Sequence, residues 1–381
     1  MSVSRRRLDL VEHAFGTAPF ALGIEEELLL VAAAPPHALD HRASEAVSLL
    51  DSPYVKPDVY EAMVECATSI CHSAQDAVYE LEHRRGDLRT GGFTLAGAGL
   101  HPEARFADVL HVEHPRYKQI HDTMRGLLER TPTAALHVHV GMPDAATAIA
   151  VCNRLRAHLP LLQALAAHSP YWHGRDSGFA TARAQLFRGF PRAVIPRAFS
   201  DWDDYVAAVT AWLGAGDLPD YTYLWWDIRP HPRLGTVELR AMDAQARLTS
   251  VAGLAALVRA LATACADGHG AIEPAEALTE SSFRAGRDGL DATIWWCGAL
   301  RPVPEVAADV LALARPYACD NGDEDALLEV HRILREGNGA DRMREAHAAG
   351  GMRSVLGRLI GDTAEPLYGY TSTMSPIRTH S

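Results

Sequence analysis

The sequence predicts an α+β fold in which an antiparallel or mixed sheet has helices packed on one face. Two observations lead to this class. Strand-like runs such as 20–31 and 135–143 carry polar side chains two positions apart, which places them on one face of a sheet. Long apolar stretches with helical spacing, such as 145–168 and 249–268, alternate with these runs and can cover the other face.

The individual elements follow from local patterns, taken in chain order. We expect strands at 20–31, 91–102 and 135–143, two more strands within 223–243, and helices at 58–85, 145–168 and 249–268. Asp144 is placed as the N-cap of the second of these helices. Segment 169–192 has no regular period, and we expect an irregular functional segment there. Short helices from about residue 304 should complete one domain over residues 1–381.

Composition excludes several classes of function. A net charge of −12 argues against nucleic acid and membrane surfaces as partners. Lys56 and Lys118 are the only lysines and neither belongs to a P-loop motif. The six cysteines form no C-x-x-C pair, as expected for free thiols in a reducing cytosol. We find no signal peptide and no apolar run of about 20 residues, so we expect a cytoplasmic protein without a membrane span. A homodimer is compatible with the sequence.

Two pairs on predicted strands have metal-ligating side chains. Glu25 and Glu27 are two positions apart, so both carboxylates leave the same face, where they repel unless a cation lies between them. His137 and His139 share a strand face in the same way, and neutral imidazoles are good metal ligands. A solvated acidic strand end and two hydrogen-bonded histidines are the simpler structural interpretations.

Two further pairs combine acidic groups with each other or with arginine. Glu238 and Arg240 share a strand face, and Arg229 precedes them on the neighbouring predicted strand. They fit a metal ligand beside phosphate-neutralising guanidinium groups, or alternatively a plain ion pair. Glu61 and Glu65 are one turn apart on the predicted helix, which also suits a solvated helix face. One site containing all four pairs would explain them together, and its carboxylate-rich ligands favour Mg²⁺ or Mn²⁺ over zinc.

Longer stretches of the chain resemble a known family. They are GIEEEL (23–28), YEAMVECATSIC (60–71), GAGLHP (97–102), HVHVG (137–141), SPYWHGRDSGFATAR (169–183) and LWWDIRPHPRLGTVELRAMD (224–243). In this order they resemble the type 2 glutamate–cysteine ligases, a family of carboxylate–amine ligases. The resemblance covers essentially the whole chain. It implies a glutamine-synthetase-like catalytic fold that uses ATP and Mg²⁺ or Mn²⁺, with an amino acid and an amine as substrates.

The resemblance also implies roles for individual residues. The implied metal ligands are Glu25, Glu27, Glu65, His137 and Glu238. His139 would lie beside the bound substrate, Arg229 and Arg240 would face the phosphates, and Arg183 would contact phosphate or substrate. Two features depart from the family pattern. Glu26 is charged where relatives often have an apolar residue, and segment 184–198 is unusually rich in arginine.

The mechanism that this family implies starts from a carboxylate, which is a poor electrophile. Its oxygen would attack the γ-phosphate of ATP to give an acyl phosphate, and an amine would then displace phosphate to form the amide. Two alternatives stay open from the sequence: a guanidino-type phosphotransferase on the same fold, and an inactive nucleotide-binding relative. The presence of every expected metal ligand as Glu or His weighs against the inactive relative.

Overall fold

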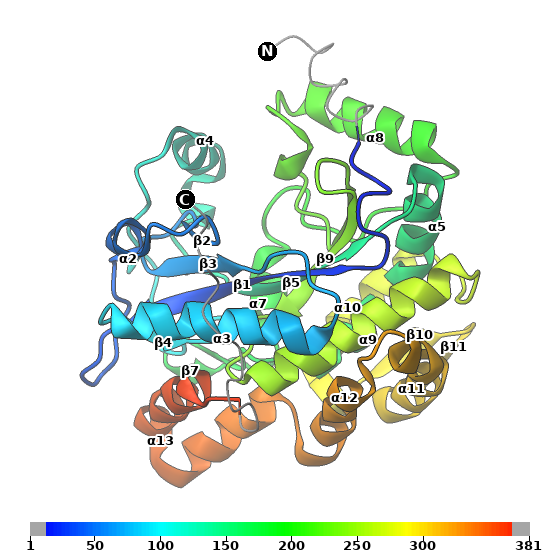
Figure 1. Cartoon of the computed structure of the whole chain (residues 1–381). Helices are drawn as coiled ribbons and strands as arrows, with labels where there is room; N and C mark the ends of the chain where they lie inside the picture. Colours follow the sequence, from blue (N-terminus) through cyan, green and yellow to red (C-terminus); the bar gives the residue numbers. More distant parts are fainter. Residues whose placement is uncertain (1–12, 368–381) are drawn as a thin grey trace, which may run out of the picture.

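A computed structural model describes residues 13–367, and a seven-stranded antiparallel sheet forms its centre. The strand order is β2-β3-β1-β5-β9-β8, with the short strand β4 also paired to β1. The strands are β1 (Leu22–Val31), β2 (Val55–Pro57), β3 (Met63–Ala67), β4 (Thr94–Ala96), β5 (Ala135–Gly141), β8 (Ile228–His231) and β9 (Thr236–Asp243). Figure 1 shows this sheet with helices above and below it.

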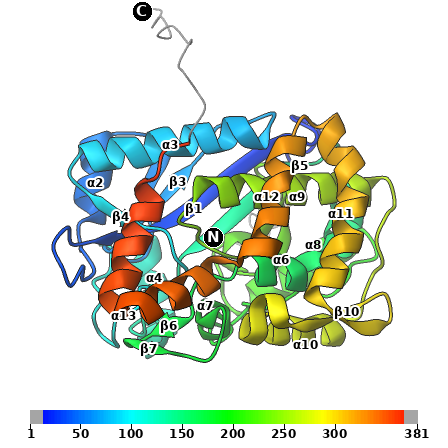
Figure 2. The same ribbon diagram turned by 90° about the horizontal axis from the view of Figure 1, so that it is seen from below.

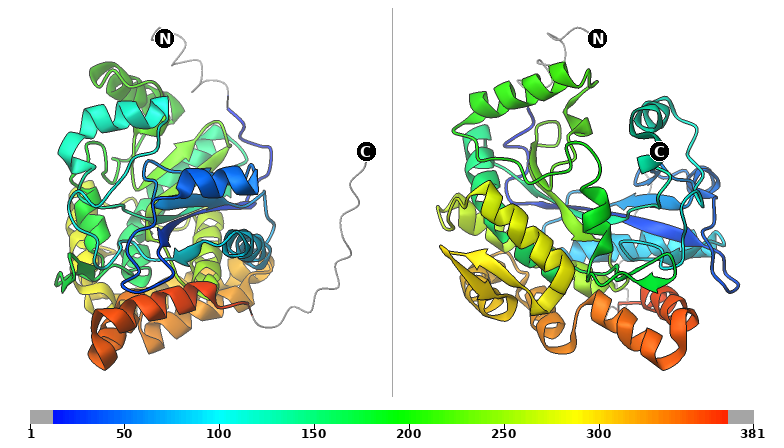
Figure 3. Two further views of the ribbon diagram at one scale, coloured as in Figure 1. Left: turned by 90° about the vertical axis from the view of Figure 1, so that its left-hand side faces the viewer. Right: turned by 180° about the vertical axis from the view of Figure 1, so that it is seen from behind.

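Residues 13–367 form twelve α-helices, most of which pack in a thick layer against one face of the sheet. They are α2 (Ala43–Leu50), α3 (Ala74–Thr90), α4 (Pro115–Met124), α5 (Ala145–Leu155), α6 (Leu159–Leu165), α7 (Ala182–Phe187), α8 (Trp202–Ala215), α9 (Leu248–Ala266), α10 (Ala275–Asp288), α11 (Val303–Asp320), α12 (Glu324–Glu336) and α13 (Gly339–Ala364). In Figures 1 and 2, α3 and α9 run across the lower face of the sheet, while α11, α12 and α13 form the outer part of this layer. Helices α4 and α8 lie on the opposite side, as both views in Figure 3 show.

Strict alternation along the strands separates the core from the open face. On β1, Leu22, Ile24, Leu28 and Leu30 are buried in the large core cluster that also contains α9. The residues between them, including Glu25 and Glu27, point to the other face because successive strand side chains alternate. The same alternation on β5 and β9 leaves the functional side chains of three neighbouring strands on one face.

The strands at 20–31, 135–143 and within 223–243 are confirmed, and so is the cap at Asp144, whose side chain accepts a hydrogen bond from Thr147 N. The helix predicted at 58–85 is wrong in its first half: residues 63–67 form β3, and helix α3 begins only at Ala74. Glu61 and Glu65 therefore do not share a helix face. The helix at 145–168 is divided into α5, a 3₁₀ turn (Arg156–His158) and α6, which has a proline in its first turn. Two short hairpins, β6–β7 (Tyr171–Trp172 and Arg175–Asp176) and β10–β11 (Thr293–Trp296 and Ala299–Pro302), complete the described chain.

Helix α9 is the one helix of residues 13–367 that is long and apolar enough to cross a membrane. Its mean hydropathy is 1.7 over the most apolar window, yet 89% of that window is buried inside the protein. It packs between the sheet and the helices α3, α5, α11 and α12, so its apolar surface is that of a central core helix.

A buried ion pair connects the sheet to the helix layer. Glu26 points away from Glu25 and Glu27, and its carboxylate accepts two hydrogen bonds from Arg85 of α3, at 2.9 and 2.6 Å. Both side chains are 1% exposed. Arg85 also donates to the carbonyl oxygens of Gln245 and Ala246, which lie just before α9. The unusual charge at position 26 is thus neutralised by a buried arginine.

Candidate active site

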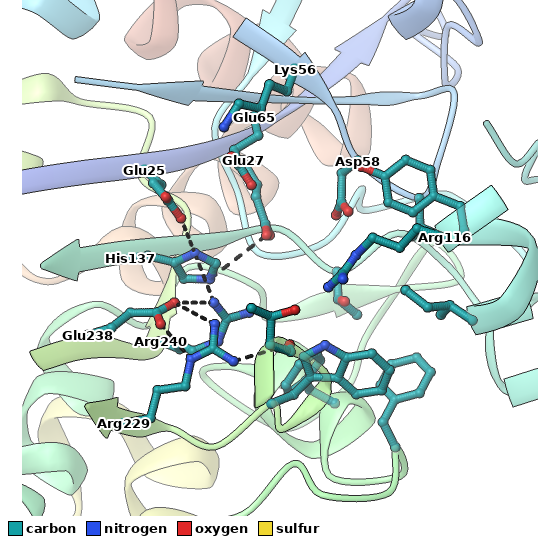
Figure 4. A pocket seen from close by; sticks show the side chains of 18 of the residues that line it. Glu25, Glu27, Lys56, Asp58, Glu65, Arg116, His137, Arg229, Glu238 and Arg240 are labelled. Carbon is teal, nitrogen blue, oxygen red and sulfur yellow. Dashed lines mark hydrogen bonds and ion pairs between the residues drawn. The ribbon is translucent and has the colours of Figure 1, made fainter. Parts of the chain in front are cut away.

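The predicted site residues lie in a row across the open face of the sheet. In the strand register, Glu65 is opposite Glu27, Glu25 is opposite His137, His139 is opposite Glu238, and Glu238 is opposite Arg229. Antiparallel pairing brings directly opposed side chains on one face close together. The row therefore extends over five neighbouring strands, and Figure 4 shows its side chains pointing into one cavity.

This cavity has a volume of about 430 Å³. Every residue proposed from the sequence as catalytic, cofactor-binding or metal-ligating lines it, namely Glu25, Glu27, Glu65, His137, His139, Arg183, Arg229, Glu238 and Arg240. Glu61 does not. Its carboxylate instead accepts hydrogen bonds from the backbone N and Oγ of Ser44, where it fastens the start of α2.

The two histidines lie on either side of Glu25. His137 Nδ1 is 3.3 Å from Glu25 Oε2, and His139 Nε2 is 3.7 Å from Glu25 Oε1. Burial raises the pKa of Glu25, but the two imidazoles outweigh it and hold this pKa well below the usual value. Burial and the nearby Arg240 lower the pKa of His137 to about 4, so this imidazole is neutral and can act as a ligand. His139 Nδ1 is 3.0 Å from Thr236 Oγ1, which orients its ring.

Glu238 is held between two arginines. Arg229 Nε donates to Glu238 Oε2 at 2.6 Å, and Arg240 Nη1 donates to Oε1. These guanidinium groups overcome the effect of burial and keep the pKa of Glu238 well below its usual value. Arg229 also donates to the backbone oxygens of Thr222 and Leu224, so the strand β8 is joined to the preceding loop. The plain ion pair considered from the sequence is therefore present, within the cavity wall.

Negative charge gathers at the other end of the row. Burial raises the pKa of Glu27 to about 8, and the Asp58 carboxylate adds to the effect. Burial also raises the pKa of Glu65 well above normal, with further contributions from Glu25, Asp58 and Glu27. Such raised values mean that these carboxylates cannot all be charged without a counter-cation. A bound cation would supply that charge.

A second observation also fits a cation. One ligand atom from each of Glu25, His139 and Glu238 lies within 4.8 Å of the other two. His139 Nε2 is buried and has no hydrogen-bond partner within residues 13–367, and it lies 3.9 Å from Glu238 Oε1. A buried nitrogen facing two carboxylates without a hydrogen bond is a feature that needs an explanation, and a metal ion provides one. The residues present therefore fit a divalent cation.

Arg183 is placed by the segment that was expected to be irregular. Asp243, the last residue of β9, accepts hydrogen bonds from Ser169 Oγ at 2.7 Å and Thr181 Oγ1 at 2.9 Å. These bonds fix both ends of the loop 169–181, and Thr181 caps α7, on which Arg183 is the second residue. Burial lowers the pKa of Arg183, and its Nε has no partner among the described residues. Its guanidinium is thus an available donor in the cavity wall.

The arginines of segment 184–198 have mostly structural roles. Arg188 pairs with Asp227 and donates to Ala193 O at 2.9 Å, Arg192 donates to Tyr223 O, and Arg197 pairs with Asp204 on α8. They hold this segment beside the cavity, which its aromatic residues line.

Sequence reasoning missed several residues of the cavity. Asp58, Lys56 and Arg116 of α4 line it (Figure 4), and so does Tyr117 of the same helix. Lys56 gave a usable signal, because it is one of two lysines and is opposite Glu65 in the register. Arg116 gave none, because it belongs to a helix whose position depends on the tertiary structure.

The comparisons with known proteins agree with this geometry. Residues 21–357 match the model of glutamate–cysteine ligase family 2. The chain belongs to this family. A Rubrobacter xylanophilus protein named "Putative glutamate–cysteine ligase 2-1" is 36% identical over 95% of this chain and 100% of its own length. A Natronomonas pharaonis protein named glutamate–cysteine ligase is 38% identical over 62% of this chain and 68% of its own length.

Solved structures confirm the glutamine-synthetase-like fold. The glutamate–cysteine ligase of Francisella tularensis, solved in complex with AMP, superposes with a TM-score of 0.70 at 13% identity, covering 91% of this chain and 89% of that one. A bifunctional glutathione synthetase from Pasteurella multocida gives a TM-score of 0.64 at 13% identity, covering 95% of this chain and 53% of that one. This member of family 2 is accordingly an ATP-dependent ligase that forms carbon–nitrogen bonds.

Proposed function

We propose that this ligase joins the side-chain carboxylate of glutamate, or of a closely related amino acid, to an amine through an acyl phosphate. One observation carries the proposal: a single cavity over the open face of the sheet is lined by six acidic side chains, three imidazoles and five guanidinium groups. Clustered carboxylates beside arginines suit a site that binds phosphate groups together with divalent cations. The names of the family relatives support glutamate as the acid and cysteine as the amine.

The proposed reaction has two steps. First, a carboxylate oxygen attacks the γ-phosphorus of ATP, the bond to the β–γ bridging oxygen breaks, and ADP leaves. Second, the amine nitrogen attacks the acyl carbon, the bond to the phosphate oxygen breaks, and phosphate and a proton leave. Neither step needs a covalent bond to the protein, so the protein contributes through positioning and electrostatics.

The proposed cation ligands are Glu25, Glu27, Glu65, His137 and Glu238. We add His139 to this set because its Nε2 is buried, unpartnered among the described residues and close to both Glu25 and Glu238. Mg²⁺ or Mn²⁺ bound there would neutralise phosphate charge and align the phosphoryl group for transfer.

The proposed role of Arg229, Arg240 and Arg183 is to bind phosphate oxygens. Arg240 is anchored through Nη1 to Glu238, while its Nε is buried without a partner among residues 13–367. Arg183 has the same kind of unused donor. Guanidinium groups that are fixed in place before phosphate transfer stabilise developing charge without reorganisation. Arg229 in addition holds Glu238 in place through its Nε.

The proposal is tested by incubating the protein with ATP, Mg²⁺, glutamate and a panel of amines that includes cysteine. ADP formation that depends on both the acid and an amine, together with an amide detected by mass spectrometry, is the expected result. Hydroxylamine traps acyl phosphates, so a hydroxamate formed without another amine would support the first step. Stable phosphorylation of a substrate without amide would instead identify a phosphotransferase, and ATP left intact with every amine would contradict the ligase.

A further inference from the structure

We propose a second metal site, outside the active-site cavity, in which His111, His121 and Glu129 bind a zinc-like divalent transition-metal ion. One ligand atom from each of these residues lies within 4.8 Å of the other two. The three come from different parts of one region: His111 precedes α4, His121 lies in its last turn, and Glu129 follows it. None of them lines the active-site cavity.

The distances bring the three side chains to one point. His121 Nε2 is 3.2 Å from Glu129 Oε1, and His111 Nδ1 is 3.9 Å from the same oxygen. The two imidazole rings lie edge to face with their centroids 4.7 Å apart. A hydrogen bond from His121 to Glu129 would explain that pair alone. It would not account for His111, whose Nδ1 faces the same oxygen from a distance that is too long for a hydrogen bond.

The surroundings resemble those of a metal-binding histidine. The second nitrogen of His121, Nδ1, faces Asp122 Oδ1 at 3.8 Å. Ligating histidines commonly direct their other nitrogen towards a carboxylate, which fixes the ring. His111 is held by its backbone, which forms an isolated bridge to Tyr60, and by its ring contact with Tyr60. Two of the three ligands are thus oriented by neighbouring groups.

The donor set selects the class of metal. Two imidazoles and one carboxylate suit Zn²⁺, Ni²⁺ or Cu²⁺ better than Mg²⁺, which prefers oxygen ligands. Two histidines and one glutamate also form a known type of zinc site, in which a water molecule completes the tetrahedron. The site therefore differs in selectivity from the carboxylate-rich active-site cavity.

A metal here would fasten α4 to the sheet edge. This helix stands apart from the helix layer (Figures 1 and 3), and only Ile120 and Met124 of its ten residues are buried. Elements with so few buried contacts open easily. The helix carries Arg116 and Tyr117 into the active-site cavity, while Tyr60, beside His111, also lines it. The ion would thus hold one wall of the cavity in place.

The test counts zinc bound tightly by the full-length protein, using a chromophoric chelator as competitor. His121→Gln and Glu129→Gln should each lose one equivalent relative to wild type. Zinc held in the active-site cavity contributes equally to all these proteins and cancels in the difference. His83→Gln is the matched control, since His83 is an exposed histidine of α3, and it should lose none. Zinc should also raise the melting temperature of wild type more than that of Glu129→Gln.

Circular dichroism first establishes that each variant is folded. If His121→Gln does not fold, Glu129→Gln and His111→Gln give the same comparison. Folded variants that bind as much zinc as wild type would overturn the proposal, and so would an equal loss in His83→Gln. The count does not depend on turnover, so its failure would leave the proposed ligase activity untouched.

Discussion

Replacing Glu26 by Gln should destabilise the protein strongly although the side chain touches no cavity residue. The substitution removes the carboxylate that neutralises Arg85 and leaves a guanidinium that is 1% exposed. Breaking a buried ion pair from one side costs about 3–5 kcal/mol, because the remaining charge stays desolvated. At about 2.1 cal/mol/K per residue, the unfolding entropy of a 381-residue chain is about 0.8 kcal/mol/K. The melting temperature should therefore fall by about 4–6 °C.

The chain offers a matched control on its surface. Arg42 and Glu45 form the same two-bonded geometry, at 2.8 and 2.6 Å, but their side chains are 41% and 57% exposed. Glu45→Gln should hardly change the melting temperature, since exposed pairs contribute little. Calorimetric scans at one fixed rate would compare the two variants with Arg85→Met and with the double variant Glu26→Gln/Arg85→Met.

The double variant should lose less stability than the sum of the losses in the two single variants. Each single substitution leaves one buried charge without its partner, whereas the double substitution removes both charges. A shift of the melting temperature in Glu26→Gln no larger than that in Glu45→Gln would contradict this prediction. Simple addition of the effects of Glu26→Gln and Arg85→Met would contradict it too.

Three further predictions concern the cavity. Glu27→Gln should abolish ATP turnover in a folded protein. Burial raises the pKa of Glu27 from 4.5 to about 8. Without metal, the stability of wild type should therefore fall as the pH rises through that range, and the stability of the variant should fall less. Melting curves recorded in EDTA would show the difference. His139→Gln should weaken Mn²⁺ binding, followed by electron paramagnetic resonance, more than His137→Gln does. His139 Nε2 is buried and forms no hydrogen bond with the described residues, whereas His137 is bonded through Nδ1 to Glu25. Equal losses would contradict this ranking. Arg240→Lys should lower kcat by about 100-fold with little change in KM for ATP, because lysine lacks the planar fork. A rise in KM alone would show that Arg240 binds ground-state ATP.

The strand-borne part of the site could be predicted because its information is local. Side chains two positions apart on a strand share a face. The pairs at 25 and 27, 137 and 139, and 238 and 240 can therefore each be assigned to one face of a strand without knowledge of the fold. What the pattern could not give is which strands are neighbours. The family resemblance supplied that link, and the antiparallel register of β1, β5 and β9 agrees with it.

The prediction at 58–85 failed for a physical reason. Met63, Val64, Cys66 and Ala67 are apolar at spacings that fit a helix as well as a strand, and β3 is only five residues long. Its strand conformation depends on pairing with β1, about 40 residues earlier in the chain, which local patterns cannot reveal. Asp58, Arg116 and Tyr117 were missed for the same reason, since loops and a peripheral helix bring them to the cavity.

The three consecutive glutamates of β1 have a consequence for how the chain tolerates insertions and deletions. Glu25 and Glu27 need the polar face, and Glu26 needs Arg85 on the other. Shifting this strand by one residue would place two carboxylates in the apolar core and one in the cavity without its partner. Both faces of the strand therefore fix its register. Insertions and deletions within β1 should therefore prevent correct folding, whatever their effect on catalysis.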